Sequence, residues 1–208
     1  MLELTDLRIS YGEFTIIENL NLQVERGSIV FILGHHGSGK SSILNAIIGN
    51  VSSRGDFLLD KKKYINRTPR SMLKIGITLV PEEKAIFPDL TVRENLLFST
   101  ILGRKRQIND WDDFFFQELK HLFEKKAYVL SGGQAKMLSL MMGCGTNPDY
   151  LLLDEPFSGL SEKPIKTLWK KILMLKDKNL GIIITGENEF IESHEINQII
   201  RLGRGVRK

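Results

Sequence analysis

The chain has 208 residues, 42% of them hydrophobic and 26% charged, and 29 basic against 25 acidic side chains leave a net charge of +4. A chain of this size and composition can bury a core without disulfides or a structural metal. Its single cysteine, Cys144, excludes an internal disulfide, so we expect a reducing, cytoplasmic compartment. No apolar run approaches the roughly 20 residues of a membrane-spanning helix, and the opening residues do not predict a secretory signal.

The positive charges do not indicate a nucleic-acid partner. They occur in short, separated clusters such as 61–63 and 104–106, without interleaved aromatic residues. Ordinary solvated surfaces explain them, and we expect no nucleic acid to bind.

The first elements predicted are strands and one helix. Apolar spacing predicts strands over 2–9 and 16–24, and the unbroken apolar run 28–33 is typical of a strand buried on both faces. A helix is predicted over 42–48, ending at Gly49, the residue best suited to the left-handed position after a helix.

The middle of the chain changes character. Residues 54–80 mix short strand candidates with turns and end in the apolar run 75–80. Thr91 and Glu94 fit a capping box, so a helix should begin there, and the aromatic-rich segment 110–126 predicts a second helix.

The remaining elements alternate. Strands are predicted over 150–153, 180–185 and 197–202, with an amphipathic helix over 163–176. Alternation of strands and helices predicts an α/β fold with a mainly parallel sheet covered on both faces. We expect a single domain, 1–208, with a helical subdomain at about 82–147.

A glycine-rich loop follows the buried strand at 28–33. It fits the spacing glycine, four residues, glycine, lysine, serine, and consists of Gly34, His35, His36, Gly37, Ser38, Gly39, Lys40 and Ser41, with Ser42 next in line. Its amides and the helix N-terminus would surround phosphate oxygens, Lys40 would reach the outer phosphates, and the Ser41 hydroxyl would ligate Mg²⁺. The alternative is a fortuitous glycine turn. The loop predicts a nucleoside triphosphate site without naming the reaction, because kinases, GTPases and motors share it.

Two carboxylates end the strand at 150–153. Asp154 is suited to hold Mg²⁺, and Glu155 to polarise the water that attacks the terminal phosphate. The alternative is a strand that runs into a charged turn.

A pentapeptide at 130–134, Leu-Ser-Gly-Gly-Gln, precedes this acidic pair. With the three motifs in this order, the whole chain resembles the ATP-binding subunits of ABC transporters. The resemblance implies a P-loop NTPase core with a mainly parallel sheet, an N-terminal antiparallel β region and a helical insertion that carries the signature motif. It also implies that the signature residues bind the ATP held by a second ATP-binding subunit: Ser131, Gly132, Gly133 and Gln134.

The resemblance carries further expectations. Tyr11 would stack on adenine, although a plain strand-end tyrosine is the alternative. Glu82 stands where the family usually has a glutamine that senses Mg²⁺ and connects to the membrane subunits. The stretch 86–96 resembles the branched-chain amino acid importer subgroup, while lipopolysaccharide and urea transport ATPases look similar there.

Two positions depart from the family pattern. Ser161 replaces an aspartate after the acidic strand, and Glu187 stands at the place of the switch histidine. A carboxylate beside the γ-phosphate would be repelled unless it is protonated or bridged by a cation. The residues therefore predict slowed or conditional hydrolysis, with catalytic roles for Glu155, Glu187 and Lys40.

The leading interpretation is an ATPase that dimerises around two Mg–ATP and pulls on separate permease subunits, lying on the cytoplasmic face of the membrane. Phe87 and Leu90 are predicted to be exposed anchors for those subunits. The alternatives are an ATP-switched interaction module without transport, a degenerate partner in a heterodimeric ATPase, and a small-molecule kinase, which leaves the signature unexplained.

Overall fold

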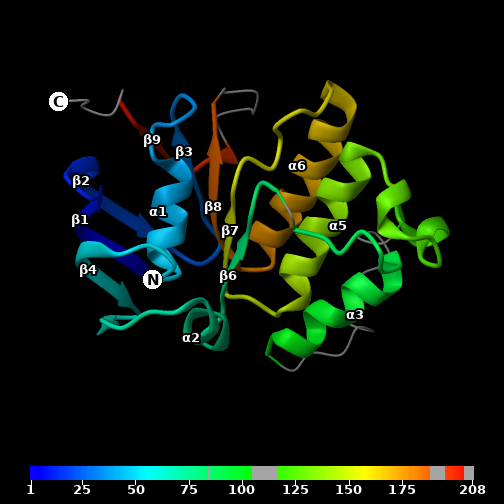
Figure 1. Cartoon of the computed structure of the whole chain (residues 1–208), viewed down its shortest axis with the longest axis horizontal. Coiled ribbons are helices and arrows are strands. Elements are labelled where there is room, and N and C mark those ends of the chain that lie inside the picture. Colours follow the sequence, from blue (N-terminus) through cyan, green and yellow to red (C-terminus); the bar gives the residue numbers. More distant parts are fainter. Residues whose placement is uncertain (84, 105–116, 188–194, 204–208) are drawn as a thin grey trace.

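The computed structural model describes residues 1–83, 85–104, 117–187 and 195–203. Its centre is a five-stranded sheet in the order β6-β7-β8-β3-β9, with every neighbouring pair parallel. The strands are β3 (Ile29–Leu33), β6 (Ile77–Val80), β7 (Tyr150–Leu153), β8 (Gly181–Gly186) and β9 (Gln198–Arg201). Their carboxyl ends therefore share one edge, where ligands of such sheets bind (Figure 1).

A second, antiparallel sheet lies beside the first. It has the order β2-β1-β4-β5, built from β1 (Leu2–Tyr11), β2 (Phe14–Val24), β4 (Ser53–Leu59) and β5 (Lys62–Lys63). The resemblance predicted this antiparallel region, and the apolar spacing predicted its first two strands.

The parallel sheet is buried on both faces. On β3, Ile29, Phe31 and Leu33 pack into one core cluster, while Val30 and Ile32 pack into the other. Alternate side chains of a strand point to opposite faces, so an unbroken apolar run is what such a strand requires.

Helices cover the two faces separately. They are α1 (Lys40–Ile47), α2 (Pro69–Lys74), α3 (Val92–Leu102), α5 (Gly132–Gly145) and α6 (Glu162–Asp177). The α1 helix packs between the two sheets, whereas α5 and α6 lie on the opposite face of the parallel sheet (Figure 1). The capping box predicted at Thr91 is confirmed: its hydroxyl accepts from the Glu94 amide, and the Glu94 carboxylate accepts from the Thr91 amide.

The helix predicted over 110–126 is wrong where the structure describes it. Residues 105–116 lie outside the described part, and 117–126 hold only a 3-10 turn, Lys120–Leu122, followed by a second at Ala127–Val129. The chain turns back because the carbonyls of Phe123 and Lys125 accept from the first amides of α3. Capping a neighbouring helix thus replaces helical bonds that the local sequence favours.

Two smaller expectations also differ. The short α2 was not predicted, although Thr68 caps it and a proline occupies its first turn. Leu90 is half-buried rather than exposed, whereas Phe87 is exposed as predicted.

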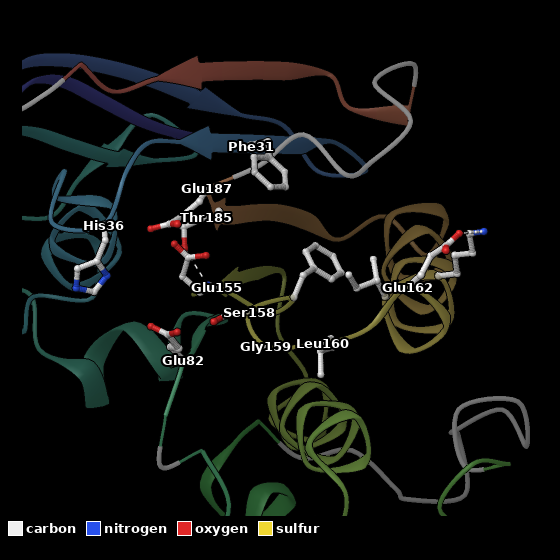
Figure 2. Close-up of a pocket in the computed structure, with 14 residues that line it drawn as sticks. Phe31, His36, Glu82, Glu155, Ser158, Gly159, Leu160, Glu162, Thr185 and Glu187 are labelled. Carbon is white, nitrogen blue, oxygen red and sulfur yellow. Dashed lines mark hydrogen bonds and ion pairs between the residues drawn. The ribbon is translucent and has the colours of Figure 1, made fainter.

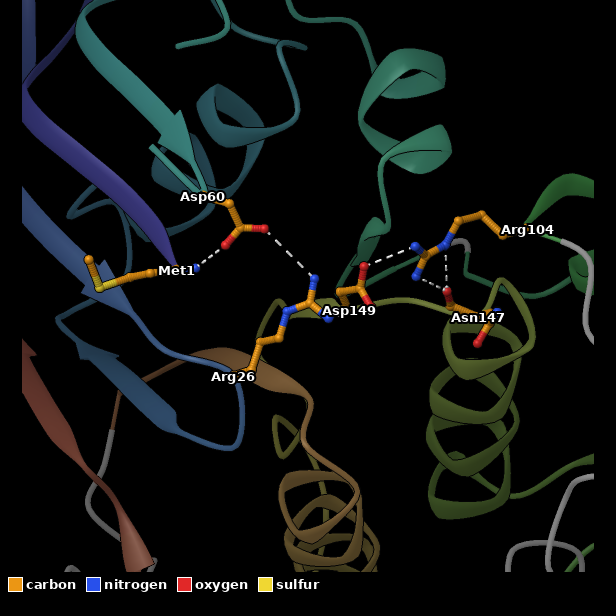
Figure 3. Close-up of polar contacts among 6 residues, drawn as sticks. All are labelled: Met1, Arg26, Asp60, Arg104, Asn147 and Asp149. Atoms are coloured by element: carbon orange, nitrogen blue, oxygen red, sulfur yellow. Dashed lines mark hydrogen bonds and ion pairs between the residues drawn. The ribbon is translucent and has the colours of Figure 1, made fainter. Parts of the chain in front are cut away.

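A chain of charges crosses the edge of the sheet opposite the carboxyl ends (Figure 3). The amino group of the chain pairs with Asp60, which lies 3.9 Å from the Arg26 guanidinium. Arg26 in turn reaches Asp149 at 3.1 Å, and Asp149 pairs with Arg104 at 2.9 Å. Arg104 also donates to the carbonyl of Asn147 beyond α5, at 3.0 and 2.6 Å. These contacts attach the ends of α3 and α5 to the core.

Candidate nucleotide site

The loop between β3 and α1 curls as the phosphate motif requires. Gly37 and Gly39 have φ angles of 77° and 95°, in the left-handed region that favours glycine. Gly39 is also the N-cap of α1, and a Cβ there would lie 2.6 Å from Ile16. The helix begins at Lys40, two residues before the prediction, so its free amides face the loop.

Lys40 lies inside this loop. Its side chain is 5% exposed, and its Nζ donates to the carbonyls of Gly34 at 2.7 Å and His35 at 3.0 Å. The same ammonium forms an ion pair with Glu155 Oε1 at 2.9 Å. The structure therefore brings together the lysine expected at the outer phosphates and the carboxylate expected at the attacking water.

Asp154 is held by two hydroxyls from neighbouring elements. Ser41 Oγ donates to Asp154 Oδ1 at 3.1 Å, and Thr185 Oγ1 donates to the same oxygen at 2.7 Å. Thr185 also accepts from the Glu155 amide at 2.9 Å. Sequence reasoning missed Thr185; its signal was a hydroxyl at the end of an apolar strand.

These oxygens fit Mg²⁺. It prefers hard oxygen ligands and usually takes only one or two carboxylates, with phosphate oxygens and water completing its shell. No group of three or more His, Cys, Asp or Glu side chains suited to a metal occurs within 1–83, 85–104, 117–187 and 195–203. Ser41 and Asp154 thus suit a metal that arrives with a nucleotide.

One cavity of about 850 Å³ lies at the carboxyl ends of the strands, and the side chains that line it include four glutamates and one lysine: Glu82, Glu155, Glu162, Glu187 and Lys166. Figure 2 shows Glu82, Glu155 and Glu187 directed into this space, with His36 across from them. Glu155 has a φ of 44°, a strained value for a residue with a side chain. Lys40 pairs with Glu155 and Lys166 pairs with Glu162, whereas Glu82 and Glu187 add further negative charge that a nucleotide phosphate entering the cavity would meet.

Tyr11 and Ser42 lie close to each other beside α1. The Tyr11 hydroxyl and Ser42 Oγ are 3.2 Å apart, and nearly half of the tyrosine side chain remains exposed. The ring is accessible to a flat ligand beside the phosphate loop.

The signature residues form the start of α5. Ser131 Oγ accepts from the Gln134 amide at 3.4 Å, and Gln134 Oε1 accepts from the Ser131 amide at 2.9 Å. Gln134 therefore caps its own helix, and Ser131 and Gly132 are exposed. Because α5 and α1 lie on opposite faces of the parallel sheet, one chain does not bring its signature and phosphate loop together (Figure 1).

Ser161 is the N-cap of α6, but its side chain makes no capping hydrogen bond. The adjacent Glu162 pairs with Lys166 on the same helix, and this hydrogen bond holds the pKa of Glu162 below its ordinary value. Ser161 thus contributes its backbone carbonyl, which accepts from the Ile165 amide at 3.2 Å, to the start of α6.

Sequence reasoning also missed two residues that shape the loop after β6. Asn95 is fully buried; its amide donates to the carbonyls of Phe87 and Thr91, and its carbonyl accepts from the Phe87 amide. Lys136 donates to the carbonyls of Glu82 at 3.0 Å and Glu155 at 3.1 Å. The Lys136 contacts span 54 and 19 residues, so residue spacing alone gave no signal for them, whereas the Asn95 contacts stay within 8 residues.

The curled loop, the lysine within it and the aspartate on the adjacent parallel strand define a nucleoside-triphosphate-binding protein of the P-loop class. The chain belongs to a particular family of that class, the ABC transporters, whose family model matches residues 17–158. It is an ABC transporter ATPase subunit, which confirms the resemblance and the fold class inferred from the sequence.

Individual proteins of known sequence or structure that resemble this chain also belong to ABC transporters. A probable branched-chain amino acid transport ATP-binding protein, LivF of Archaeoglobus fulgidus, is 31% identical over 193 residues, covering 90% of this chain and 82% of its own. A nucleotide-free ATP-binding cassette from an ABC transporter superposes with a TM-score of 0.86 at 25% identity, covering 99% of this chain and 88% of that one. A dimeric bacterial ABC transporter cassette shares the fold, with a TM-score of 0.80 at 24% identity and coverage of 99% and 95%.

No helix among the residues that the structure describes is long and apolar enough to cross a membrane.

Proposed function

We propose that two ATPase domains bind two Mg–ATP between them and drive transport through separate membrane subunits. The observation that carries this proposal is the separation of the phosphate loop from the exposed signature amides, because each chain then offers two half-sites. A head-to-tail pair completes both, with Ser131, Gly132 and Gly133 of one chain facing the phosphates held by the other. The dimeric cassette of the same fold supports this arrangement.

Within each site the residues have distinct roles. Tyr11 lies beside adenine, the loop amides and Lys40 bind the phosphates, and Ser41 and Asp154 hold Mg²⁺, with Glu82 near it. The metal neutralises phosphate charge and orients the terminal group when it is bound. Glu155 takes a proton from the attacking water as its oxygen bonds to the γ-phosphorus. The bond between that phosphorus and the bridging oxygen breaks, and ADP leaves with the electron pair.

Before nucleotide binds, Lys40 and Glu155 form an ion pair with each other. While it exists, the positive charge of the lysine on Oε1 makes the carboxylate a weaker base. Phosphate oxygens compete for the Lys40 ammonium, so nucleotide entry releases Glu155 for proton transfer. Binding and activation of the base are thereby linked.

Hydrolysis is slow or conditional in this proposal, because Glu187 adds a carboxylate to a cavity that already holds Glu82 and Glu155. The assay is Mg–ATP hydrolysis across protein concentration, with Glu155→Gln as the blank. Turnover that rises with concentration and vanishes in Glu155→Gln supports a self-sufficient dimer. Glu187→His should raise turnover; an unchanged or lower rate contradicts the inhibitory role of Glu187.

The dock for the membrane subunits is an apolar surface on α3 and the loop before it. Its exposed members are Phe87, Leu97, Phe98, Ile101 and Leu102. The rings of Phe87 and Phe98 pack edge to face at 4.8 Å, which makes them one continuous anchor. Buried Asn95 fixes the backbone beneath Phe87, so the surface is held in shape.

Replacing Phe87 and Phe98 together by serine should abolish association with permease subunits and leave ATP binding intact. Ile65→Ser is the matched control, since Ile65 is 78% exposed and lies outside this surface. Equal loss of association in both variants, or loss of ATP binding in the double variant, counts against the docking surface.

The remaining features of the proposal are a cytoplasmic location at the membrane through the permease, and a single ATPase domain over 1–208 with a helical subdomain at about 82–147. Substituted Ser161 and Glu187 favour a second candidate, an ATP-switched module or a degenerate partner in a heterodimer. Retained ATP binding without turnover, restored by mixing with a homologue that has the histidine, would favour that candidate.

A further inference from the structure

Lys136 connects three segments that are far apart in the sequence. It lies in the second turn of α5, half-buried, and its Nζ donates to the carbonyls of Glu82 and Glu155 at 3.0 and 3.1 Å. One ammonium therefore joins the signature helix, the loop after β6 and the peptide that carries the proposed catalytic base.

The surroundings of Lys136 act on its charge in both directions, and burial has the larger effect. Burial lowers the pKa of Lys136, while the carboxylates of Glu82, Asp154 and Glu155 act in the opposite direction. An ammonium carries three donors, so it can bond both carbonyls at once, and hydrogen bonds from a charged donor are stronger than neutral ones.

The backbone of Glu155 is thus held at both its amide and its carbonyl. Thr185 Oγ1 accepts from its amide at 2.9 Å, and Lys136 bonds its carbonyl. The φ of 44° at Glu155 is unfavourable for a residue with a side chain and persists only where contacts enforce it. These two bonds fix the direction in which the Glu155 carboxylate leaves the backbone.

We propose that Lys136 is a positioning residue for hydrolysis, which ties the Glu155 peptide to the loop at Glu82. The inference rests on the proposed role of Glu155 as the base.

The structure offers a matched control. Lys176 on α6 is also half-buried, and its Nζ donates to the carbonyl of Glu195 at 3.0 Å, in contact with neither Glu82 nor Glu155. Lys136→Met and Lys176→Met each remove a lysine bond to a carbonyl, but only the first touches the base. Lys136→Gln keeps a donor without the charge.

Steady-state hydrolysis separates positioning from stability. At saturating Mg–ATP, Lys136→Met should lower kcat about tenfold, with KM within about twofold of wild type and thermal stability no lower than that of Lys176→Met. Lys136→Gln should recover part of the lost rate. A kcat of Lys136→Met within about twofold of wild type, or an equal fall in Lys176→Met, overturns the proposal.

Deuterium exchange tests the two Lys136 bonds to the Glu82 and Glu155 carbonyls, here called the tether, without any measurement of hydrolysis. If the wild type proves inactive, the proposed catalysis fails, but the tether still predicts that Lys136→Met speeds amide exchange at 80–83 and 155–158. Exchange at 34–41 should stay unchanged, and Mg–ATP should protect 34–41 equally in both proteins. Unchanged exchange at 80–83 and 155–158 overturns the tether itself.

Discussion

Replacing Thr185 by valine keeps the shape of a fully buried side chain and removes its hydroxyl. That hydroxyl donates to Asp154 at 2.7 Å and accepts from the Glu155 amide at 2.9 Å. A hydrogen bond to a charged group is worth about 1.5–3 kcal/mol, and an amide left unpaired costs about 1–3 kcal/mol. The added methyl group returns about 0.8 kcal/mol. We therefore expect the free energy of unfolding to fall by about 2–5 kcal/mol.

Urea denaturation of the nucleotide-free protein measures this difference. Thr167→Val is the control, because Thr167 is only half-buried and its hydroxyl donates to the Lys163 carbonyl of its own helix, at 3.1 Å, in place of a charged group. That variant should stay within about 0.5 kcal/mol of wild type. Thr185→Val should also lose most of its ATP turnover, since the Glu155 amide is no longer anchored. A Thr185→Val protein as stable and as active as wild type would refute the reasoning.

Two further substitutions test the start of α3. The amide of Thr91 holds the pKa of Glu94 below its ordinary value of 4.5, so the carboxylate adds stability above that value which is lost as pH falls through the lowered pKa. Denaturation should accordingly find Glu94→Gln less stable than wild type near neutral pH, with the difference shrinking on acidification; a pH-independent difference argues against the charge. Asn95→Leu leaves the Phe87 amide and the Thr91 carbonyl without their side-chain partner and should cost about 2–4 kcal/mol, whereas a change under about 0.5 kcal/mol would show that water replaces these bonds.

The sequence predicted the parts of the fold that local patterns determine. The apolar run at 28–33 could be nothing other than a buried element, and the structure places it at β3 with both faces covered. The segment 117–126 shows the limit of this reasoning. Its apolar residues do enter the core, as fully buried Leu119 illustrates, but its backbone bonds go to α3 and not to itself.

The residues of the candidate site also fall into two groups, those that the sequence predicted and those that it did not. Lys40, Asp154 and Glu155 were predictable because each follows a strand within a short motif. Thr185 and Lys136 were not, because the former bonds a residue 31 positions away and the latter bonds one 19 positions away. Such pairs meet only through the order of strands in the sheet, which residue spacing does not encode.

The charge chain through Asp149 has a mechanical consequence for the signature. Arg104 bonds the loop after α5, while Ser131 begins the same helix at its other end, one turn before Lys136 and its bonds to Glu82 and Glu155. A helix of 14 residues is about 21 Å long. A tilt of about 10° about the end near Arg104 would move Ser131 by about 4 Å, more than the length of a hydrogen bond. In the proposed dimer, the charges around Asp149 at one end of α5 and the Lys136 bonds at the other would therefore set how closely the signature amides approach a phosphate on a second chain.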